Sequence, residues 1–493
     1  MRLVTPDMIP VIDKYAVEVM QISEHELMGR AADALFSAVK KYAPSAENVV
    51  IFAGRGNNGG DGYALAARLA QSMSVTVYDV FDAGQRSEGG KYWLDRARLS
   101  GARISVLPDE LSLDGFDLAV DAIFGTGFVG ECPERVIEIS KILDRSDIFK
   151  IAVDVPIGVN ADTGAVEPFA YRADVTVMLS FAKVGELSYP AREYVGISVI
   201  DDLGISSAAE CLEFKNYFVD DALALSLLPQ RKQNTSKGDF GRVTLIVGSD
   251  KYRGAAHLAL EGALRGGAGY VTFVGEASLA AELRAKFPEA IYLNRGSAAS
   301  PRDVILIGCG CGCNEDLALT VENLIKSSGA PLVLDADAIN AIAKYSSADI
   351  FLLKKRKIIL TPHPLEFSRI SGYTTEYINA HRLECAKEFA AKYGVVLLLK
   401  GAASVITDGD VTFINSTGSS ALAKAGSGDV LAGIATSLIA QCPENPLAMT
   451  ALAAYLHGRA GDELEAELSS YGVTPSDLPI KIAKVIASMK GIL

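Results

Sequence analysis

The sequence predicts an α/β protein with two domains, each a mostly parallel β-sheet covered by helices. Its 493 residues are too many for a single hydrophobic core, so at least two domains are expected. Short runs rich in β-branched residues alternate with longer amphipathic segments along the whole chain. Nearly continuous apolar strands that alternate with helices are typical of parallel sheets buried on both faces.

Six strands are predicted in each half of the chain. In the first half they are Val49–Phe52, Val75–Val80, Leu118–Phe124, Ile151–Pro156, Val175–Ser180 and Ile197–Asp201. In the second half they are Val243–Val247, Tyr270–Val274, Val304–Gly308, Pro331–Ala336, Lys357–Pro362 and Val395–Lys400. The strand–helix alternation weakens between Gly204 and Lys237. We therefore expect domains at residues 1–208 and 209–493, each of ordinary size.

Composition narrows the classes of function. The net charge of −13 disfavours binding to nucleic acid or to a membrane surface. No apolar run approaches the ~18 residues of a membrane span, and the start of the chain, MRLVTPDMIPVIDKY, lacks the pattern of a signal peptide. Seven cysteines in 493 residues fit a reducing compartment. These features predict a soluble, cytoplasmic protein.

Four polar loops follow strands in the first half, where parallel sheets bind ligands. They are GRGNNGGDG, DAIFGTGFVGE, VDVPIGVNADTG and FAKVG. The first contains GxGxxG, and Asp79 follows it at the spacing of a ribose-binding carboxylate in a dehydrogenase. Asp61 lies inside the loop, however, and a carboxylate there would repel a pyrophosphate. Asp121 and Asp154 end strands, where they could hold a cation or move a proton. The alternative is that these loops only turn the chain and cap helices.

GNNGGDG, D-A-x-F-G-T-G and V-D-x-P-x-G-x-x-x-D-T-G, in this order, resemble the N-terminal epimerase domain of the NAD(P)H-hydrate repair enzymes over about residues 1–205. The resemblance implies a Rossmann-like domain that interconverts the R and S forms of NADH or NADPH hydrated at C6. It implies a potassium ion held by Asn58 and Asp121, and Asp154 as acid or base near C6, with Lys183 as a weaker candidate. The implied substrate-binding residues are Asn57, Asn58, Gly59, Gly60, Asp61, Gly125, Thr126, Gly127, Phe128, Val129, Gly130, Glu131 and Asp154.

Two positions depart from the pattern of that family. Ile157 stands where the family usually has a serine whose oxygen helps to bind potassium. A backbone carbonyl could replace that ligand, because hard cations accept any oxygen. Gly29, in LMGRAA, stands where the family usually has glutamate. Both departures bear on potassium binding and on epimerase activity.

The richest motif of the second half is NSTGSSALAKAGSGDVLAGI, at residues 415–434. Gly426 and Gly428 precede Asp429, and the following segment reads as a helix. Free amides at a helix N-terminus bind anions. A carboxylate at that point is placed to take a proton from a hydroxyl that attacks a phosphoryl group. The alternative is a helix capped after a glycine turn. Further polar loops after strands are KGAAS, TPHPLEF and GSDKYRGAAHLA.

SKGDFGRV, YRGAAHLA, DADAIN, TPHPLEF, LKGAAS and AGSGDVLAG resemble the ribokinase-like dehydratase domain of the same repair system over about residues 225–493. The resemblance implies that Asp429 is the catalytic base, that ADP (or ATP, as in eukaryotic members) is the co-substrate, and that Mg²⁺ assists. The implied substrate-binding residues are Ala255, Gly310, His363 and Asp429. The implied nucleotide-binding residues are Lys400, Gly401, Ala402, Ala403, Ser404 and Gly428.

The leading hypothesis is a bifunctional enzyme, an epimerase followed by an S-specific dehydratase on one chain. A homo-oligomer is expected. One alternative is a ribokinase-like vitamin or sugar kinase, because that fold is permissive. Another is a dehydratase whose N-terminal domain is an inactive scaffold, since similar domains act in mRNA decapping. Cys309, Cys311 and Cys313 alternate in a Gly-rich loop. We interpret them as small buried residues, with metal binding as the alternative.

Overall fold

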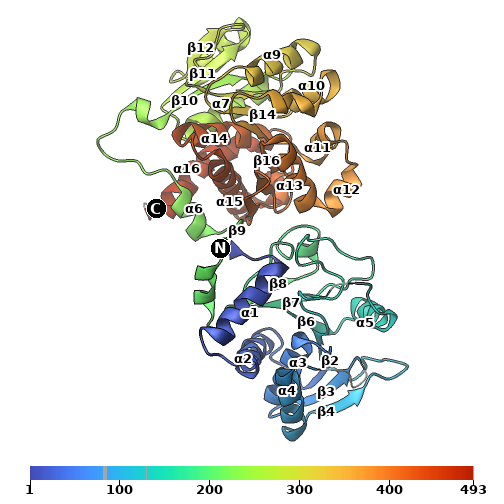
Figure 1. Cartoon of the computed structure of the whole chain (residues 1–493). Helices are drawn as coiled ribbons and strands as arrows, with labels where there is room; N and C mark the ends of the chain where they lie inside the picture. The colour runs from blue at the N-terminus through green and yellow to red at the C-terminus, as the bar shows by residue number, and fades with distance from the viewer. Residues whose placement is uncertain (82–85, 129, 492–493) are drawn as a thin grey trace. The chain divides into compact units, whose positions relative to one another are not determined.

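The computed structural model describes residues 1–81, 86–128 and 130–491, which form two compact units (Figure 1). One unit comprises residues 2–214, and the other comprises residue 1 with residues 215–493. The boundary expected at 208/209 falls within the 3-10 helix η3 (Ser206–Cys211), shortly before that division. In the described part of the chain, no helix is both long and apolar enough to cross a bilayer.

The N-terminal unit contains a seven-stranded sheet in the order β4-β3-β2-β5-β6-β7-β8, and every neighbouring pair is parallel. The strands of this sheet are β2 (Asn48–Ala53), β3 (Ser74–Asp79), β4 (Arg103–Val106), β5 (Leu118–Ala122), β6 (Phe149–Val153), β7 (Val175–Leu179) and β8 (Ile197–Asp201). The unit also contains β1 (Arg2–Leu3), which lies outside this sheet. Its helices are η1 (Pro6–Met8), α1 (Ile9–Glu18), α2 (Glu24–Tyr42), α3 (Asn57–Leu69), α4 (Glu88–Leu99), α5 (Glu134–Arg145), η2 (Ala191–Glu193) and η3.

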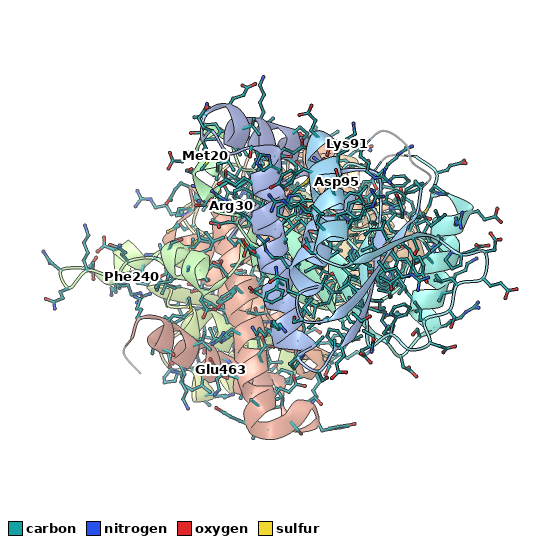
Figure 2. All side chains as sticks on the ribbon, turned by 90° about the horizontal axis from the view of Figure 1, so that it is seen from below. Met20, Arg30, Lys91, Asp95, Phe240 and Glu463 are labelled. Atoms are coloured by element: carbon teal, nitrogen blue, oxygen red, sulfur yellow. The ribbon has the colours of Figure 1, made fainter. Side chains whose placement is uncertain are left out.

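Helices cover both faces of this sheet, which explains its apolar strands. Val50 and Phe52 of β2 point to the face where α5 packs. Helices α2, α3 and α4 pack against one another over the opposite face, and Figure 2 shows α2 and α4 side by side, with Arg30 labelled on α2. Arg30 donates to the carbonyl oxygen of Leu203 at 2.9 Å and so ties α2 to the segment after β8. The loops at the carboxyl ends of β2, β5, β6 and β7 therefore gather at one edge.

The C-terminal unit is built on a sheet that runs β9-β18-β17-β16-β15-β14-β13-β10-β11-β12. Its strands are β9 (Asn216–Val219), β10 (Arg242–Ile246), β11 (Tyr270–Gly275), β12 (Ile291–Asn294), β13 (Val304–Ile307), β14 (Leu332–Leu334), β15 (Ile358–Leu360), β16 (Val396–Leu399), β17 (Val405–Thr407) and β18 (Thr412–Asn415). From β12 at one edge to β16, every pair of neighbouring strands in this order is parallel. Strand β17 is antiparallel to both of its neighbours, β16 and β18.

Helices also cover this second sheet on both faces. They are α6 (Asp221–Leu227), η4 (Lys237–Phe240), α7 (Arg253–Arg265), α8 (Ala277–Lys286), α9 (Glu315–Lys326), α10 (Asp337–Tyr345), η5 (Ala348–Leu353), α11 (Pro364–Ser371), α12 (Thr375–Ala380), α13 (Arg382–Tyr393), η6 (Ser420–Leu422), α14 (Ser427–Gln441), α15 (Pro446–Gly472), η7 (Pro475–Asp477) and α16 (Leu478–Met489). Helices α7, α14, α15 and α16 share one core with alternate residues of the central strands. Figure 1 shows α9, α10 and α11 on the other side.

The predicted fold class is confirmed, and each of the twelve predicted strands is present with small shifts at its ends. The sequence analysis did not predict β1, β4, β9, β12, β17 or β18. Strands β4 and β12 are sheet edges with mostly exposed or half-exposed residues, so they lack the apolar run that marks a central strand. Strands β17 and β18 form a short antiparallel pair instead of a strand–helix unit.

Candidate active sites

The N-terminal unit contains a cavity of about 850 Å³ at the carboxyl edge of its sheet. Loops after β2, β5, β6 and β7 line it together with α1 and α2. The sequence-predicted residues that line the cavity are Asn57, Asn58, Asp61, Gly125, Thr126, Gly127, Phe128 and Asp154. Gly59, Gly60, Asp121, Gly130 and Glu131 are not among the lining residues, and Val129 lies outside the described residues. The volume fits a ligand of nucleotide size.

Close backbone packing explains why the first loop contains glycines. Helix α3 begins inside the motif, at Asn57. A Cβ atom at Gly59 would lie 1.9 Å from the carbonyl oxygen of Gly54, so no larger residue fits there. Asn58 Nδ2 donates to the carbonyl oxygens of Phe124, at 2.8 Å, and Val153, at 3.2 Å. This side chain therefore joins three of the four loops.

Asp154 and Lys183 form a buried ion pair at the cavity wall. The ammonium group donates to Asp154 Oδ1, and the backbone amide of Thr126 donates to Oδ2 at 3.3 Å. Burial is the largest single effect and lowers the pKa of Lys183, but Asp154, Glu186 and Asp13 together raise it more, so the net shift is upward and the lysine is protonated. Asp154 has a positive φ of 66°, an uncommon conformation for a residue with a side chain. Lys183, only a weak candidate from sequence, is thus in direct contact with the predicted catalytic carboxylate.

Two further acids of the cavity were missed by the sequence analysis. Asp13 of α1 and Glu24 of α2 line the same space as Asp61 and Asp154. Burial, and then the charge of Asp154, raises the pKa of Asp13 to about 6. Burial raises the pKa of Asp61 well above its ordinary value. The only sign of Asp13 in the sequence is its place at the end of the apolar stretch MIPVID. That pattern is also typical of an ordinary amphipathic helix and does not indicate a site.

Asp121 is buried beneath the loops and accepts three hydrogen bonds. Its Oδ2 accepts from the amide of Ile157 and the hydroxyl of Tyr171, both at 3.0 Å, and its Oδ1 accepts from the amide of Ile123 at 3.1 Å. Burial raises the pKa of Asp121 to about 6 despite these bonds. The side chain of Ile157 is 2% exposed and belongs to the apolar core around β2 and α5.

The surroundings of Asn58 and Asp121 suit a potassium ion by donor type. The carboxylate of Asp121, the amide oxygen of Asn58 and the carbonyl oxygens of Phe124 and Val153 are all hard oxygen ligands. Ile157 contributes no side-chain oxygen to this set. Gly29 faces the ring of Trp93 and is not a lining residue, so its departure from the family pattern alters packing between α2 and α4.

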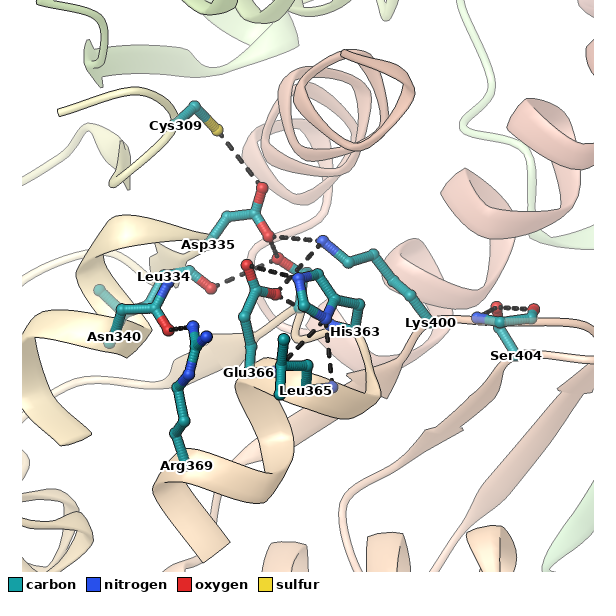
Figure 3. A network of polar contacts seen from close by, with 12 residues as sticks. Cys309, Leu334, Asp335, Asn340, His363, Leu365, Glu366, Arg369, Lys400 and Ser404 are labelled. Atoms are coloured by element: carbon teal, nitrogen blue, oxygen red, sulfur yellow. Dashed lines mark hydrogen bonds and ion pairs between the residues drawn. The ribbon is translucent and has the colours of Figure 1, made fainter. Parts of the chain in front are cut away.

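In the C-terminal unit, polar residues follow four neighbouring parallel strands. Cys309 follows β13, Asp335 follows β14, His363 follows β15 and Lys400 follows β16. Because these strands run in the same direction, their carboxyl ends meet, and Figure 3 shows these residues pointing toward one another. This is where open parallel sheets bind their ligands.

A buried ion pair lies at the centre of this network. Lys400 Nζ is 2.9 Å from Asp335 Oδ1 and 3.9 Å from Glu366 Oε2. Thr361 Oγ1 donates to the same Asp335 oxygen at 2.8 Å. Burial lowers the pKa of Lys400, but the two carboxylates raise it more, so the net shift is strongly upward. Asp335 and Glu366 were not predicted as site residues, although both lie in motifs quoted for the resemblance.

His363 caps α11, the helix that follows β15. Its Nδ1 accepts the amides of Leu365, at 3.2 Å, and Glu366, at 3.3 Å, while Nε2 lies 3.3 Å from Glu366 Oε1. Partial burial and the charge of Lys400 lower the pKa of His363. The imidazole is therefore neutral at pH 7, with its proton on Nε2, and half of its surface faces solvent at the site.

Asp429 stands in the first turn of α14. The preceding Gly426 has φ of +103°, a conformation that favours glycine. Burial, and then the negative charge of Asp335, raises the pKa of Asp429 to about 6. A Cβ atom at Gly428 would lie 3.4 Å from Lys400 Nζ, so the helix start approaches the ammonium group closely. His457 of α15, fully buried and neutral, supports this turn by donating to the carbonyl oxygen of Ser427 at 3.0 Å.

The remaining predicted residues fall into two places. Lys400 to Ser404 form a turn in which Ser404 Oγ donates to the carbonyl oxygen of Gly401 at 2.8 Å. Ala403, with φ of 44°, takes a left-handed conformation in that turn, next to Ala402. A Cβ atom at Gly310 would lie 2.8 Å from that of Ala255, so these two predicted residues adjoin. Asp79, which suggested a dehydrogenase, instead pairs with Arg86 and lies outside the cavity lining.

The alternating cysteines do not converge on one point. Cys311 Sγ donates to the carbonyl oxygen of Ile246 at 3.2 Å, whereas Cys309 Sγ lies 3.5 Å from Asp335 Oδ2. Among the described residues, one group of three potential metal ligands exists, Cys309, Asp335 and Asp429, whose ligand atoms lie within 4.8 Å of one another. Lys400 already supplies positive charge to Asp335, so this group is better described as a hydrogen-bonded network than as a metal centre.

Comparisons with known proteins match both units. Residues 24–185 match the family described as YjeF-related protein N-terminus, and residues 243–484 match the family described as NAD(P)H-hydrate dehydratase. The bifunctional NAD(P)H-hydrate repair enzyme Nnr of Coxiella burnetii is 32% identical over 95% of this chain and 96% of its own. The enzyme of the same name from Escherichia coli is 32% identical over 96% of this chain and 92% of its own.

A solved structure matches the C-terminal unit. It is the ADP/ATP-dependent NAD(P)H-hydrate dehydratase of Bacillus subtilis, co-crystallized with ATP/Mg²⁺. The similarity has a TM-score of 0.51 with 30% sequence identity, and it covers 55% of this chain and 98% of that one.

Proposed function

This chain belongs to the bifunctional NAD(P)H-hydrate repair enzymes, and we propose that its two units carry out the two steps of that repair. The family resemblance expected from the loop motifs is thereby confirmed. The N-terminal unit would interconvert the R and S hydrates of NADH or NADPH. The C-terminal unit would convert the S hydrate back to the reduced cofactor at the expense of ADP. The observation that carries this proposal is the position of Asp429 in the first turn of α14, with its carboxylate within 4.8 Å of that of Asp335, which binds Lys400.

The dehydration requires a better leaving group than hydroxide. We assign Asp429 as the base that takes the proton from the C6 hydroxyl. The hydroxyl oxygen then attacks the terminal phosphoryl group of ADP. The free amides at the start of α14 and the ammonium of Lys400 stabilise the charge on the phosphoryl oxygens. The C6–O bond then breaks with help from the ring nitrogen lone pair, phosphate leaves, and loss of the C5 proton restores the dihydropyridine. AMP and phosphate are the other products.

Nucleotide binding is assigned to the turn from Lys400 to Ser404 and to Gly428. The similarity to a dehydratase crystallized with ATP/Mg²⁺ supports ADP or ATP, with Mg²⁺, as the second substrate. We assign Mg²⁺ to the nucleotide phosphates, where it would offset their charge, because the Asp335 carboxylate is already engaged by Lys400 and Thr361. Ala255, Gly310 and His363 are assigned to the hydrate, next to Asp429.

Epimerisation at C6 requires a bond to that carbon to be broken and made again. We assign the proton transfers of this step to Asp154, held by Lys183 at the wall of the cavity. The nicotinamide hydrate would occupy the cavity between the loops that contain Asn57 and Gly125. Asn58, Asp61 and Asp154 line this one cavity, which favours an active epimerase over an inactive scaffold.

Potassium binding is proposed for Asn58 and Asp121. The carbonyl oxygens of Phe124 and Val153 accept from Asn58 Nδ2 and would have to exchange that donor for the ion to complete the set. Such an ion would fix the loops around the substrate and offset the charge of the buried Asp121. Since Ile157 supplies no oxygen, we expect weaker binding than a serine at this position would give.

The decisive experiment supplies mixed R and S hydrates of NADH with ADP, and in parallel with ATP. Complete conversion to NADH is expected if both units work. Conversion that stops once the S form is consumed would show a silent N-terminal unit. Accumulation of a stable phosphate ester, with a thiazole, pyridoxal or sugar alcohol as the preferred acceptor, would instead indicate a kinase.

A further inference from the structure

We infer that Cys309 is a positioning residue of the dehydratase site, whose thiol is shared between Asp335 and Asp429 and holds the Asp429 carboxylate ready to accept a proton. The inference rests on the proposed function of Asp429. It assigns a role to a cysteine that the chemistry of the repair reaction does not itself require.

The geometry around the thiol carries this inference. Cys309 is completely buried, and its Sγ lies 3.5 Å from Asp335 Oδ2. The ligand atoms of Cys309, Asp335 and Asp429 all lie within 4.8 Å of one another. The other oxygen of Asp335, Oδ1, is occupied by Lys400 and Thr361, at 2.9 and 2.8 Å. Asp335 is therefore fixed in place, and its free oxygen is turned toward the thiol.

Asp429 depends on the same thiol. Hydrogen bonding from Cys309 lowers the pKa of Asp429 and partly offsets the larger effects of burial and of Asp335, both of which raise it. The other charges that act on Asp429 are Lys400, which lowers its pKa, and Asp337, which raises it. His457, the titratable residue of α15 behind this turn, is neutral and bonds to the carbonyl oxygen of Ser427.

The thiol is suited to act as a donor because it stays protonated. Burial, followed by the charges of Asp335 and Asp429, raises the pKa of Cys309 well above its ordinary value. Its backbone is also fixed, since the amide of Gly248 donates to the carbonyl oxygen of Cys309 at 2.7 Å. A thiol that stays protonated on a fixed backbone can donate its one proton to either of two carboxylates that would otherwise repel each other.

Removal of the thiol should therefore raise the pKa of Asp429. As a base, Asp429 works only when it is ionised, so the rate falls as the pH drops through its pKa. Cys309→Ala should move this acid limb to higher pH. A shift of about half to one pH unit lowers the rate about three- to tenfold on the acid side, near pH 5.5, and leaves the rate near pH 8 within about twofold.

The test measures kcat/KM against pH for dehydration of the purified S hydrate of NADH with ADP. Wild type is compared with Cys309→Ala, with Cys309→Ser and with Cys385→Ala. Cys385, on α13, is a buried cysteine of the same unit and is the matched control for the loss of a thiol. We expect the shifted acid limb in Cys309→Ala alone, with the wild-type profile restored by the hydroxyl donor of Cys309→Ser.

Superimposable profiles for wild type and Cys309→Ala would overturn the inference, and so would a Cys309→Ser profile equal to that of Cys309→Ala. If wild type itself made no NADH from the S hydrate, the proposed function would fail first. A second measurement covers the case in which Cys309→Ala does not fold. The infrared S–H stretch of Cys309, identified by its loss in Cys309→Ser, should shift in Asp429→Asn, and an unchanged band would overturn the inference.

Discussion

Lys400 Nζ lies 2.9 Å from Asp335 Oδ1, and the carboxylate of Glu366 lies 3.9 Å from the same ammonium group. One buried cation thus faces two buried carboxylates at the carboxyl edge of the sheet, close to Gly428 at the start of α14. Before a nucleotide binds, the carboxylates balance the lysine. Nucleotide phosphates bound at the proposed site would be in reach of the same ammonium group, so this network would link the stability of the fold to nucleotide binding.

Lys400→Met should therefore weaken both properties. Removal of the cation leaves Asp335 and Glu366 as uncompensated buried charges, at a cost of about 3–5 kcal/mol in the free energy of unfolding. The KM for ADP should rise as well. Chemical denaturation and steady-state kinetics would measure the two effects.

The double variant Lys400→Met/Asp335→Asn separates the two effects. It removes one of the stranded charges, so part of the stability should return while nucleotide affinity stays low. Equal stability of the single and double variants would show that the ion pair does not stabilise the fold.

Asp429→Asn should lower activity and raise stability. Burial raises the pKa of Asp429 from its ordinary value of 3.8 to about 6, so the folded protein holds this proton more tightly than the unfolded chain does. Ionised Asp429 therefore costs stability above about pH 6, and the cost vanishes below about pH 4, where both states are protonated. Asparagine should raise the unfolding free energy at pH 7 by up to about 3 kcal/mol.

Dehydration by Asp429→Asn should fall by about 10²–10⁴-fold, the usual contribution of a general base. Unfolding at pH 7 and at pH 4, together with NADH formation from the S hydrate, would measure both effects. Substantial remaining turnover would remove Asp429 from the chemistry, and an equal stability gain at both pH values would refute its raised pKa.

Asp154→Asn should silence the N-terminal unit alone. The variant replaces the carboxylate that Lys183 holds at the cavity wall, so R-to-S conversion should fall by about 10²–10⁴-fold. The R hydrate, supplied with ADP, then yields NADH slowly, while the pure S hydrate is consumed at the wild-type rate and serves as the internal control. Normal conversion of the R hydrate would mean that another cavity acid, such as Asp13, moves the proton.

Most of the fold was predictable because the central strands are apolar on both faces and therefore distinct in sequence. The edge strand β12 was not predictable, because its residues are mostly exposed. The antiparallel pair β17–β18 was not predictable either, because no helix separates its two strands in the sequence. The family motifs located the loops but not every charge within them. Asp13 contributes from a helix far from those loops in sequence, and its role depends on burial that only the folded chain produces.

The charged network of the C-terminal unit also could not be predicted from the sequence. Asp335 and Glu366 lie within the family motifs, but their contacts with Lys400 depend on the folding of three separate loops and are not visible in the sequence. Cys309 looked like part of a cysteine repeat. Its thiol and that of Cys311 contact different groups, and the backbone between them turns at Gly310, which has a positive φ of 64°.

Ile157→Ser should strengthen the response of the epimerase to potassium. The amide of Ile157 already donates to Asp121 Oδ2 at 3.0 Å, so a hydroxyl at this residue would add an oxygen ligand close to the predicted ion. The substitution also removes a buried apolar side chain, which costs about 2–5 kcal/mol by analogy with Ile→Ala changes in cores. Ile157→Ala is the matched control, since it loses the same packing without gaining an oxygen.

The measurement is the ratio of the R-to-S rate in KCl to that in NaCl, at a temperature where all three proteins are folded. The ratio should be larger for Ile157→Ser than for wild type or Ile157→Ala. Because a proton competes with the ion for Asp121, whose pKa is about 6, the potassium response should weaken as the pH falls below that value. At pH 7.5, about 1.5 units above that pKa, ratios close to one for all three proteins would argue against a potassium site at Asn58 and Asp121.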